Sequence, residues 1–176
     1  MRIPFTNLEL KTFVINRLPG QASTISRLTY SGVSVTEETA LNCVAVWACI
    51  RLLSETLASL PLHLYKRLPR GKERSASHPL YKILHDRPNE DMNSFTFRET
   101  LMSHLVSWGN AYAYIDWENY TTVKQLIPLR PDRMLIKRDN ETGKIVYLYS
   151  PLNEKIASTG MVTFPSWRIL HIPGLG

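Results

Sequence analysis

The 176-residue sequence predicts an α+β fold in which N-terminal helices pack on a mostly antiparallel small sheet or barrel. Two long stretches with helical spacing of apolar residues come first, and short stretches with strand-like alternation follow from Asn110 onward. Turn sequences separate these later stretches, which favours hairpins and antiparallel pairing. An apolar content of 44% and a charged content of 20% allow a packed core and argue against a largely disordered chain.

The N-terminal part is expected to hold an arm and one long helix. Residues 1–35 are rich in Pro, Gly, Ser and Thr and predict an irregular arm. Thr36 is the expected N-cap of a helix that ends before Pro61. The middle of this helix, ALNCVAVWACIRLL, is apolar on nearly every side, but it is too short to span a membrane and Arg51 and Glu55 interrupt its second half. We therefore expect a helix buried in protein, with one face covered by a neighbouring subunit or by chain beyond this sequence.

Two further helices are expected before the sheet. PLHLYKR at 61–67 predicts a strand, and the loop LPRGKERSAS follows it. Ser77 is the expected cap of a short helix with Pro79 in its first turn. The next helix covers 95–108, and its expected buried stripe consists of Phe97, Leu101, Leu105 and Trp108.

A helix-to-strand junction is expected within LVSWGNAYAYIDW at 105–117. Gly109 can take the left-handed conformation that ends a helix, and Asn110 tolerates turn geometry. In the strand that follows, Tyr112 and Tyr114 share one face. They could stack on nucleic-acid bases, but packing against a helix or a neighbouring strand is the favoured interpretation. The remaining expected strands are VKQLIPL, MLIKR, KIVYLYS, MVTF and RILHI.

The sequence offers little that indicates catalysis, and we predict no catalytic residue, no bound cofactor and no metal site. The five histidines form neither an HExxH motif nor an i, i+4 pair, and GxSxG and P-loop motifs are absent. Cys43 and Cys49 are expected to be buried free thiols in a reducing compartment, which favours the cytoplasm. RILHIPGLG at the C-terminus leaves open a nucleotide-dependent enzyme continuing past Gly176, although Pro173 argues against a parallel βαβ unit. Because the sequence stops directly after an expected strand, it looks like a piece of a longer protein.

Positive charge is the main indication of a partner. The chain has a net charge of +6, which biases it toward anionic partners. The first basic stretch is 66–74, with Lys66, Arg67, Arg70, Lys72 and Arg74. The second is 130–138, with Arg130 and Arg133 as candidate contacts. Such loops suit phosphate contacts that do not read sequence, although a solvated loop is the simpler interpretation of each.

Four stretches together resemble the N-terminal part of tailed-bacteriophage portal proteins of the HK97-like family. They are ALNCVAVWACIRLLSETLASLPLHLY, HPLYKILHDRPNEDMNSFTFRETLMSHLVSWGNAYAYI, QLIPLRPDRM and ILHIPG. No single motif decides the resemblance, and their joint order over about residues 36–174 makes it specific.

The resemblance implies a structural subunit without catalytic activity. It implies a homo-oligomeric ring, typically a dodecamer, at one capsid vertex, with double-stranded DNA passing non-specifically through its channel. The implied partners are terminase, head-completion or connector proteins and the capsid protein, with no membrane, and the implied location is the virion after assembly in the host cytoplasm. Residues 36–176 would then be a fragment of the wing-like body that stops before the stem, clip and crown. A stand-alone basic nucleic-acid-binding domain is the alternative.

Overall fold

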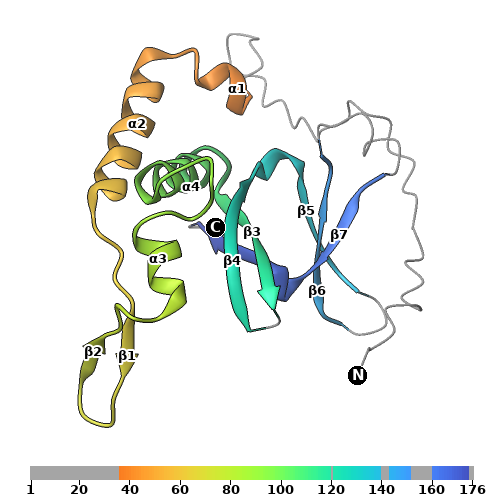
Figure 1. The fold of residues 1–176 in the computed structure, drawn as a ribbon. Helices are drawn as coiled ribbons and strands as arrows, with labels where there is room; N and C mark the ends of the chain where they lie inside the picture. The colour runs from red at the N-terminus through yellow and green to blue at the C-terminus, as the bar shows by residue number, and fades with distance from the viewer. Residues whose placement is uncertain (1–35, 120, 140–142, 152–159, 175–176) are drawn as a thin grey trace.

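The computed structural model describes the chain except residues 1–35, 120, 140–142, 152–159 and 175–176. The expected N-terminal arm therefore lies outside the described residues. The predicted α+β class is confirmed: the helices and a two-stranded hairpin lie on one side of the molecule, and two three-stranded antiparallel sheets lie on the other (Figure 1). The strands of the described part form a two-stranded hairpin and two three-stranded sheets, without a closed barrel.

The predicted first helix is two helices, α1 (Glu37–Ala40) and α2 (Val44–Ser59). Thr36 caps α1 as expected, because its side chain accepts a hydrogen bond from the Thr39 amide. The chain then turns: the amides of Asn42 and Cys43 bond to carbonyls three residues back, and Cys43 takes an extended conformation. The prediction of one continuous helix was wrong here, and its end before Pro61 was right.

The predicted strand 61–67 is shorter than expected and belongs to a hairpin. β1 (Tyr65–Arg67) pairs antiparallel with β2 (Lys72–Arg74), which the sequence pattern had placed in a loop. Gly71 closes the turn with a φ of 93°, and its carbonyl accepts a hydrogen bond from the Leu68 amide. The helix α3 (Pro79–His85) follows, with Pro79 in its first turn as expected. Its cap is His78 rather than Ser77, because the His78 Nδ1 atom accepts from the Leu80 amide at 3.1 Å.

The helix α4 (Ser94–Trp108) ends as the sequence predicts. Gly109 is left-handed, with φ 71° and ψ 1°, and β3 (Asn110–Asn119) begins at the next residue. β3 is the middle strand of the first three-stranded sheet, between β4 (Thr122–Leu129) and β8 (Ile169–Pro173). The Gly109 carbonyl also accepts from the Gly174 amide at 2.8 Å, so one glycine fastens the helix end to the end of β8.

Two small cores lie on opposite faces of β3. Its alanines face α4, and this core consists of Phe97, Leu101, Ala111, Ala113 and Leu126. Tyr112 faces the second sheet and packs with Tyr147 and Ile169. That sheet contains β5 (Met134–Arg138), β6 (Ile145–Tyr149) and β7 (Val162–Pro165) in this order. The short 3₁₀ turns Pro131–Arg133 and Ser166–Arg168 lead into β5 and β8.

The connector between α3 and α4 is fastened to the outer strand β4. The Leu126 amide donates to the Pro88 carbonyl at 2.9 Å, and the Asn89 side-chain amide donates to the Leu126 carbonyl at 2.7 Å. The Asn89 Oδ1 atom in turn accepts from the amides of Asp91 and Met92. A single asparagine therefore shapes the connector and pairs it with the middle of a strand.

Candidate functional site

The described residues bring together no arrangement typical of catalysis or metal binding. Within these ranges, no group of three or more His, Cys, Asp or Glu side chains could hold a metal ion. Cys43 and Cys49 are free, as expected, but exposed, so the prediction of buried thiols was wrong. β8 pairs antiparallel with β3, which removes the parallel strand that a dinucleotide-binding turn would need. None of the helices in the described part has both the length and the apolar character of a membrane span.

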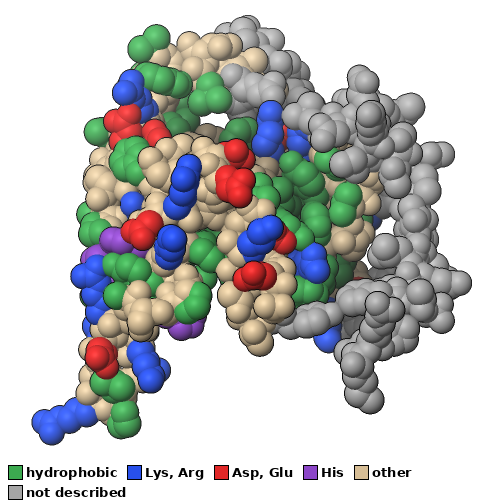
Figure 2. Space-filling model, in the orientation of Figure 1, with side chains coloured by type: hydrophobic (Ala, Val, Ile, Leu, Met, Phe, Trp, Pro, Cys, Tyr) green, Lys and Arg blue, Asp and Glu red, His purple; other side chains and the backbone are tan. Residues whose placement is uncertain are grey.

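The hairpin β1–β2 gathers all five cations of the first basic stretch on an arm that extends from the body (Figures 1 and 2). Every residue of both strands is exposed. In the pairing register Tyr65 lies opposite Arg74 and Arg67 opposite Lys72, so these four side chains share one face. Lys66 lies opposite Glu73 on the other face. The one acid of the hairpin is thus on the face away from Arg67, Lys72 and Arg74, which we call the cation face.

Aromatic rings position two members of the cation face. The Lys72 ammonium lies 5.0 Å from the centroid of the Tyr65 ring, and the Arg74 guanidinium lies 5.5 Å from that of Tyr81 on α3. Arg74 also donates a hydrogen bond to the Tyr81 hydroxyl. Both cations are therefore held in place and still have donors for an incoming anion.

A stack of rings fixes the base of the hairpin to α3. His85 stacks on Tyr81 with centroids 4.8 Å apart and on His63 with centroids 5.0 Å apart. The His85 Nδ1 atom lies 3.0 Å from the Leu62 carbonyl oxygen. Desolvation, and after it the positive charge of Arg74, lowers the pKa of His63, which favours a neutral ring in this stack. The orientation of the hairpin is thus set by side-chain contacts as well as by its two chain connections.

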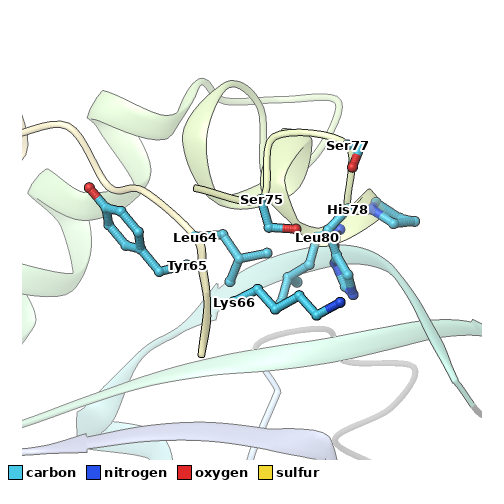
Figure 3. A pocket seen from close by; sticks show the side chains of 8 residues that line it. Leu64, Tyr65, Lys66, Ser75, Ser77, His78 and Leu80 are labelled. Atoms are coloured by element: carbon cyan, nitrogen blue, oxygen red, sulfur yellow. Dashed lines mark hydrogen bonds between the residues drawn. The ribbon is translucent and has the colours of Figure 1, made fainter. Parts of the chain in front are cut away.

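An open hollow of about 650 Å³ lies where the hairpin meets the start of α3. Figure 3 shows its lining, which includes Lys66 and Tyr65 from β1, Leu80 from α3 and Ser75, Ser77 and His78 from the segment between. Because the hollow is open, we regard it as a surface depression beside the hairpin and not as an enclosed ligand site.

The second basic stretch lies apart from the hairpin, toward the β5 side of the molecule (Figure 1). Arg130 binds Asp132 through two hydrogen bonds of 3.0 and 2.9 Å, and the Arg133 Nε atom lies 3.9 Å from the same carboxylate. Asp132 therefore offsets part of the charge of both arginines. The structure does not combine the two basic stretches into one patch.

The helix α2 presents an apolar surface to solvent. Its small residues Ser54 and Ala58 are buried, and Arg98 of α4 donates to the Ala58 carbonyl at 2.8 Å. Large apolar side chains on its other faces are exposed: Val44 by 80%, Trp47 by 48%, Leu52 by 67%, Leu53 by 48% and Leu57 by 43%. The expected burial of this helix in protein is therefore not found within the described chain, where most of its faces are exposed. The surfaces that pack on α2 in the described chain cover only its narrow small-residue face.

The junction residues have a structural role. The Asn110 Oδ1 atom can only accept a hydrogen bond, so His171 donates to it from Nε2 at 2.9 Å. The other ring nitrogen of His171, Nδ1, lies 3.3 Å from the Tyr147 hydroxyl. His171 also stacks on Tyr112 at 4.6 Å. Burial lowers the pKa of His171 and raises the pKa of Tyr112 and Tyr147. The cluster joins the two sheets, and the 3% exposure of Tyr112 excludes base stacking on its ring. Tyr114 accepts a hydrogen bond from Arg168 and packs on Phe164.

Sequence reasoning missed Asn89, His171 and Tyr81 as organising residues. Asn89 follows a proline in a polar connector, a context that signals a turn but not a bond to a strand 37 residues later. His171 and Asn110 are 61 residues apart, and nothing local in either segment indicates that they meet.

Comparisons with known proteins place this fold and sequence among phage portal proteins. A family model described as Phage portal protein matches residues 44–176. The portal protein of Enterobacteria phage HK97 is 31% identical over 172 residues, which cover 93% of this chain and 39% of that protein. Protein BeeE of Escherichia coli (strain K12) is 32% identical over 103 residues, which cover 58% of this chain and 65% of that protein.

Solved structures share the fold at lower identity. A chain in the neck of an empty gene transfer agent (GTA) particle, computed with C6 symmetry, aligns with a TM-score of 0.65 and 20% identity, covering 85% of this chain and 41% of that one. A chain in the neck of the native particle, computed with C12 symmetry, aligns with a TM-score of 0.57 and 18% identity, covering 89% of this chain and 37% of that one. The sequence thus spans about two fifths of the length of the HK97 protein and of these chains.

Proposed function

The chain belongs to the phage portal protein family, and we propose that it is a subunit of the portal ring at one vertex of a phage capsid. The family is structural, so the prediction that the chain is not an enzyme is confirmed. Family membership also confirms the resemblance found in the sequence. The match of the family model to residues 44–176 is the observation that carries the proposal.

In this role the ring, typically of twelve subunits, is the conduit through which double-stranded DNA enters the capsid and later leaves it. Terminase docks on the ring during packaging, head-completion or connector proteins bind it afterwards, and the capsid protein surrounds it. Assembly takes place in the host cytoplasm, and the ring then stays at the virion vertex. Residues 36–176 form part of the wing-like body. Chains of the same fold occur in necks computed with C6 and with C12 symmetry, which supports a ring whose subunit number is a multiple of six.

The apolar surface of α2 supports contacts between subunits. Its exposed leucines Leu53 and Leu57 are one helical turn apart, and the exposed Leu60 follows directly after the helix. Contiguous apolar surface on a soluble protein marks an interaction site. In a ring each subunit meets its neighbour through two different patches, so one apolar patch per chain can be covered around the whole ring.

Electron microscopy of the product of the complete gene tests the proposal. We expect closed rings, and only monomers at high protein concentration would contradict the proposed function. Light scattering on the double variant Leu53→Ser/Leu57→Ser tests the role of α2, with weaker assembly expected. Ile127→Ser/Ile136→Ser is the matched control, because these strand residues are also about 40% exposed and lie away from α2.

The alternative of a stand-alone nucleic-acid-binding domain loses its main support, because family membership accounts for the fold without it. The gathering of cations on one face of the hairpin is a separate observation.

A further inference from the structure

We propose that the cation face of the β1–β2 hairpin binds the phosphate backbone of duplex DNA without reading its sequence. This inference goes beyond the ring and does not depend on it, because the hairpin is complete within one chain. It assigns a ligand to Arg67, Lys72 and Arg74, with Arg70 at the turn of the same arm.

The charge on this face is uncompensated. None of the ion pairs that join described residues involves a cation of the hairpin. Glu73 is paired across the ladder with Lys66 and faces away. An anionic ligand would therefore meet three positive side chains without an opposing carboxylate, which favours attraction at long range.

The shape of the arm fits a duplex. The hairpin is a two-stranded ribbon with every strand residue exposed, and the major groove of B-DNA admits such a ribbon. Lys72 and Arg74 are two residues apart on one strand, so their Cα atoms are about 6.5 Å apart, and Arg67 lies directly across from Lys72. DNA presents one charge per roughly 1.7 Å of helix axis, so several phosphates lie within reach of this face.

An acidic protein surface is a less suitable ligand. Protein interfaces are depleted in Lys, Glu and Asp and enriched in aromatic residues, Met and Arg, and the charged residues lie mostly at the polar rim. On the cation face the Lys72 ammonium lies over the ring of Tyr65, which stays 48% exposed, and the Arg74 guanidinium lies over Tyr81. The face therefore presents three cations around one exposed ring, and its donors suit phosphate contacts.

Counterion release gives the expected magnitude. Three phosphate contacts predict a slope of log K against log salt of about −2.7, which is a loss of about 40-fold in affinity between 50 and 200 mM salt. Such binding is weak and reversible at physiological salt, so it is compatible with DNA that moves past the protein.

Fluorescence anisotropy with two labelled 24-base-pair duplexes of unrelated sequence, titrated with the chain between 50 and 200 mM NaCl, tests the proposal. The face variant is Arg67→Gln/Lys72→Gln, and Arg74 is left intact because it also anchors the hairpin to Tyr81. The matched control is Lys66→Gln/Lys124→Gln, which removes the same charge from the other face of the hairpin and from an exposed position on β4. Far-UV circular dichroism checks that both variants are folded.

We expect both duplexes to bind with equal affinity. In the face variant the slope of log K against log salt should be less steep by about 1.8, and the affinity at 50 mM NaCl should fall by at least about tenfold. The control variant should keep most of the slope and most of the affinity. Absence of binding by the unmodified chain would overturn the proposal. Equal losses in the two variants would also overturn it, because net charge and not the face would then be responsible. Poly-L-glutamate and unlabelled DNA, added at equal charge, compete with the labelled duplex. If the two displaced it equally well, the face would not select phosphate, and the proposal would be overturned in favour of an acidic protein partner.

Discussion

Replacing Gly109 with alanine is expected to destabilise the fold by about 1 kcal/mol, although the new methyl group has free space around it. Apart from its two chain neighbours, no atom of the described residues lies within 4 Å of a Cβ added at this position, so steric overlap does not contribute. The φ of 71° does contribute, because an L-residue in the left-handed region costs roughly 1–2 kcal/mol that glycine avoids. Alanine also lowers the conformational entropy of the unfolded chain, which stabilises the fold by about 0.4–1 kcal/mol, so the net loss in the free energy of unfolding is near 1 kcal/mol.

Urea denaturation followed by tryptophan fluorescence measures this loss, since Trp108 is adjacent. With a slope of about 2 kcal/mol per molar urea, the midpoint should fall by about 0.5 M. Gly109→Asn is the matched variant and should lose less, because asparagine tolerates the left-handed conformation. Gly174→Ala provides the contrast: its Cβ would lie 2.6 Å from the Gly109 carbonyl oxygen, so it should lose more through overlap at the same junction. If Gly109→Ala proved as stable as the unmodified chain, or Gly109→Asn lost as much as Gly109→Ala, the left-handed cap would not explain the glycine.

Three further predictions concern buried groups. Burial lowers the pKa of both His171 and His104, so just below pH 6.5 the unfolded chain binds more protons than the folded chain. The free energy of unfolding should therefore fall as the pH drops from 7.5 to 5.5. The urea midpoint of His171→Gln should depend less on pH than that of the unmodified chain. Trp108 is half-buried, and its ring meets the His104 ring edge-on with centroids 5.5 Å apart. Trp108→Ala should therefore lower the free energy of unfolding by roughly 2 kcal/mol, less than the 3–5 kcal/mol lost with a fully buried tryptophan. A loss under about 1 kcal/mol in urea denaturation would contradict the observed packing. The Ser54 hydroxyl is buried without a hydrogen-bond partner among the described residues, so Ser54→Ala should raise thermal stability or leave it unchanged. A loss above about 1 kcal/mol would contradict this prediction.

The sheets could be predicted because their signals are local. The alternation in NAYAYIDW places alanines on one face and tyrosines on the other, and the structure puts these two sets into two different cores. The Gly109 stop was equally local, since glycine adopts the left-handed conformation more readily than any other residue. The hairpin was only partly predictable, because β2 consists of Lys, Glu and Arg and has no apolar face from which to infer a strand.

The helix α2 shows the limit of this reasoning. Apolar composition indicates that a surface will be covered but not which molecule covers it, and in the described chain only the face with Ser54 and Ala58 is covered. The positions of Arg67 and Lys72 could be inferred only as members of a basic stretch. Their common face depends on the pairing register, which the turn at Gly71 sets and which composition does not reveal.

The pairing of Asn89 with Leu126 has a consequence for how this protein can associate. β4 is the outer strand of its sheet, and outer strands offer unpaired amides and carbonyls to strands of other molecules. The Pro88 carbonyl and the Asn89 side chain occupy both backbone groups of Leu126, in the middle of that edge. A foreign strand cannot pair continuously along β4, so this edge is protected against the runaway strand addition that leads to fibres. Association of this chain through the β4 edge is thereby disfavoured.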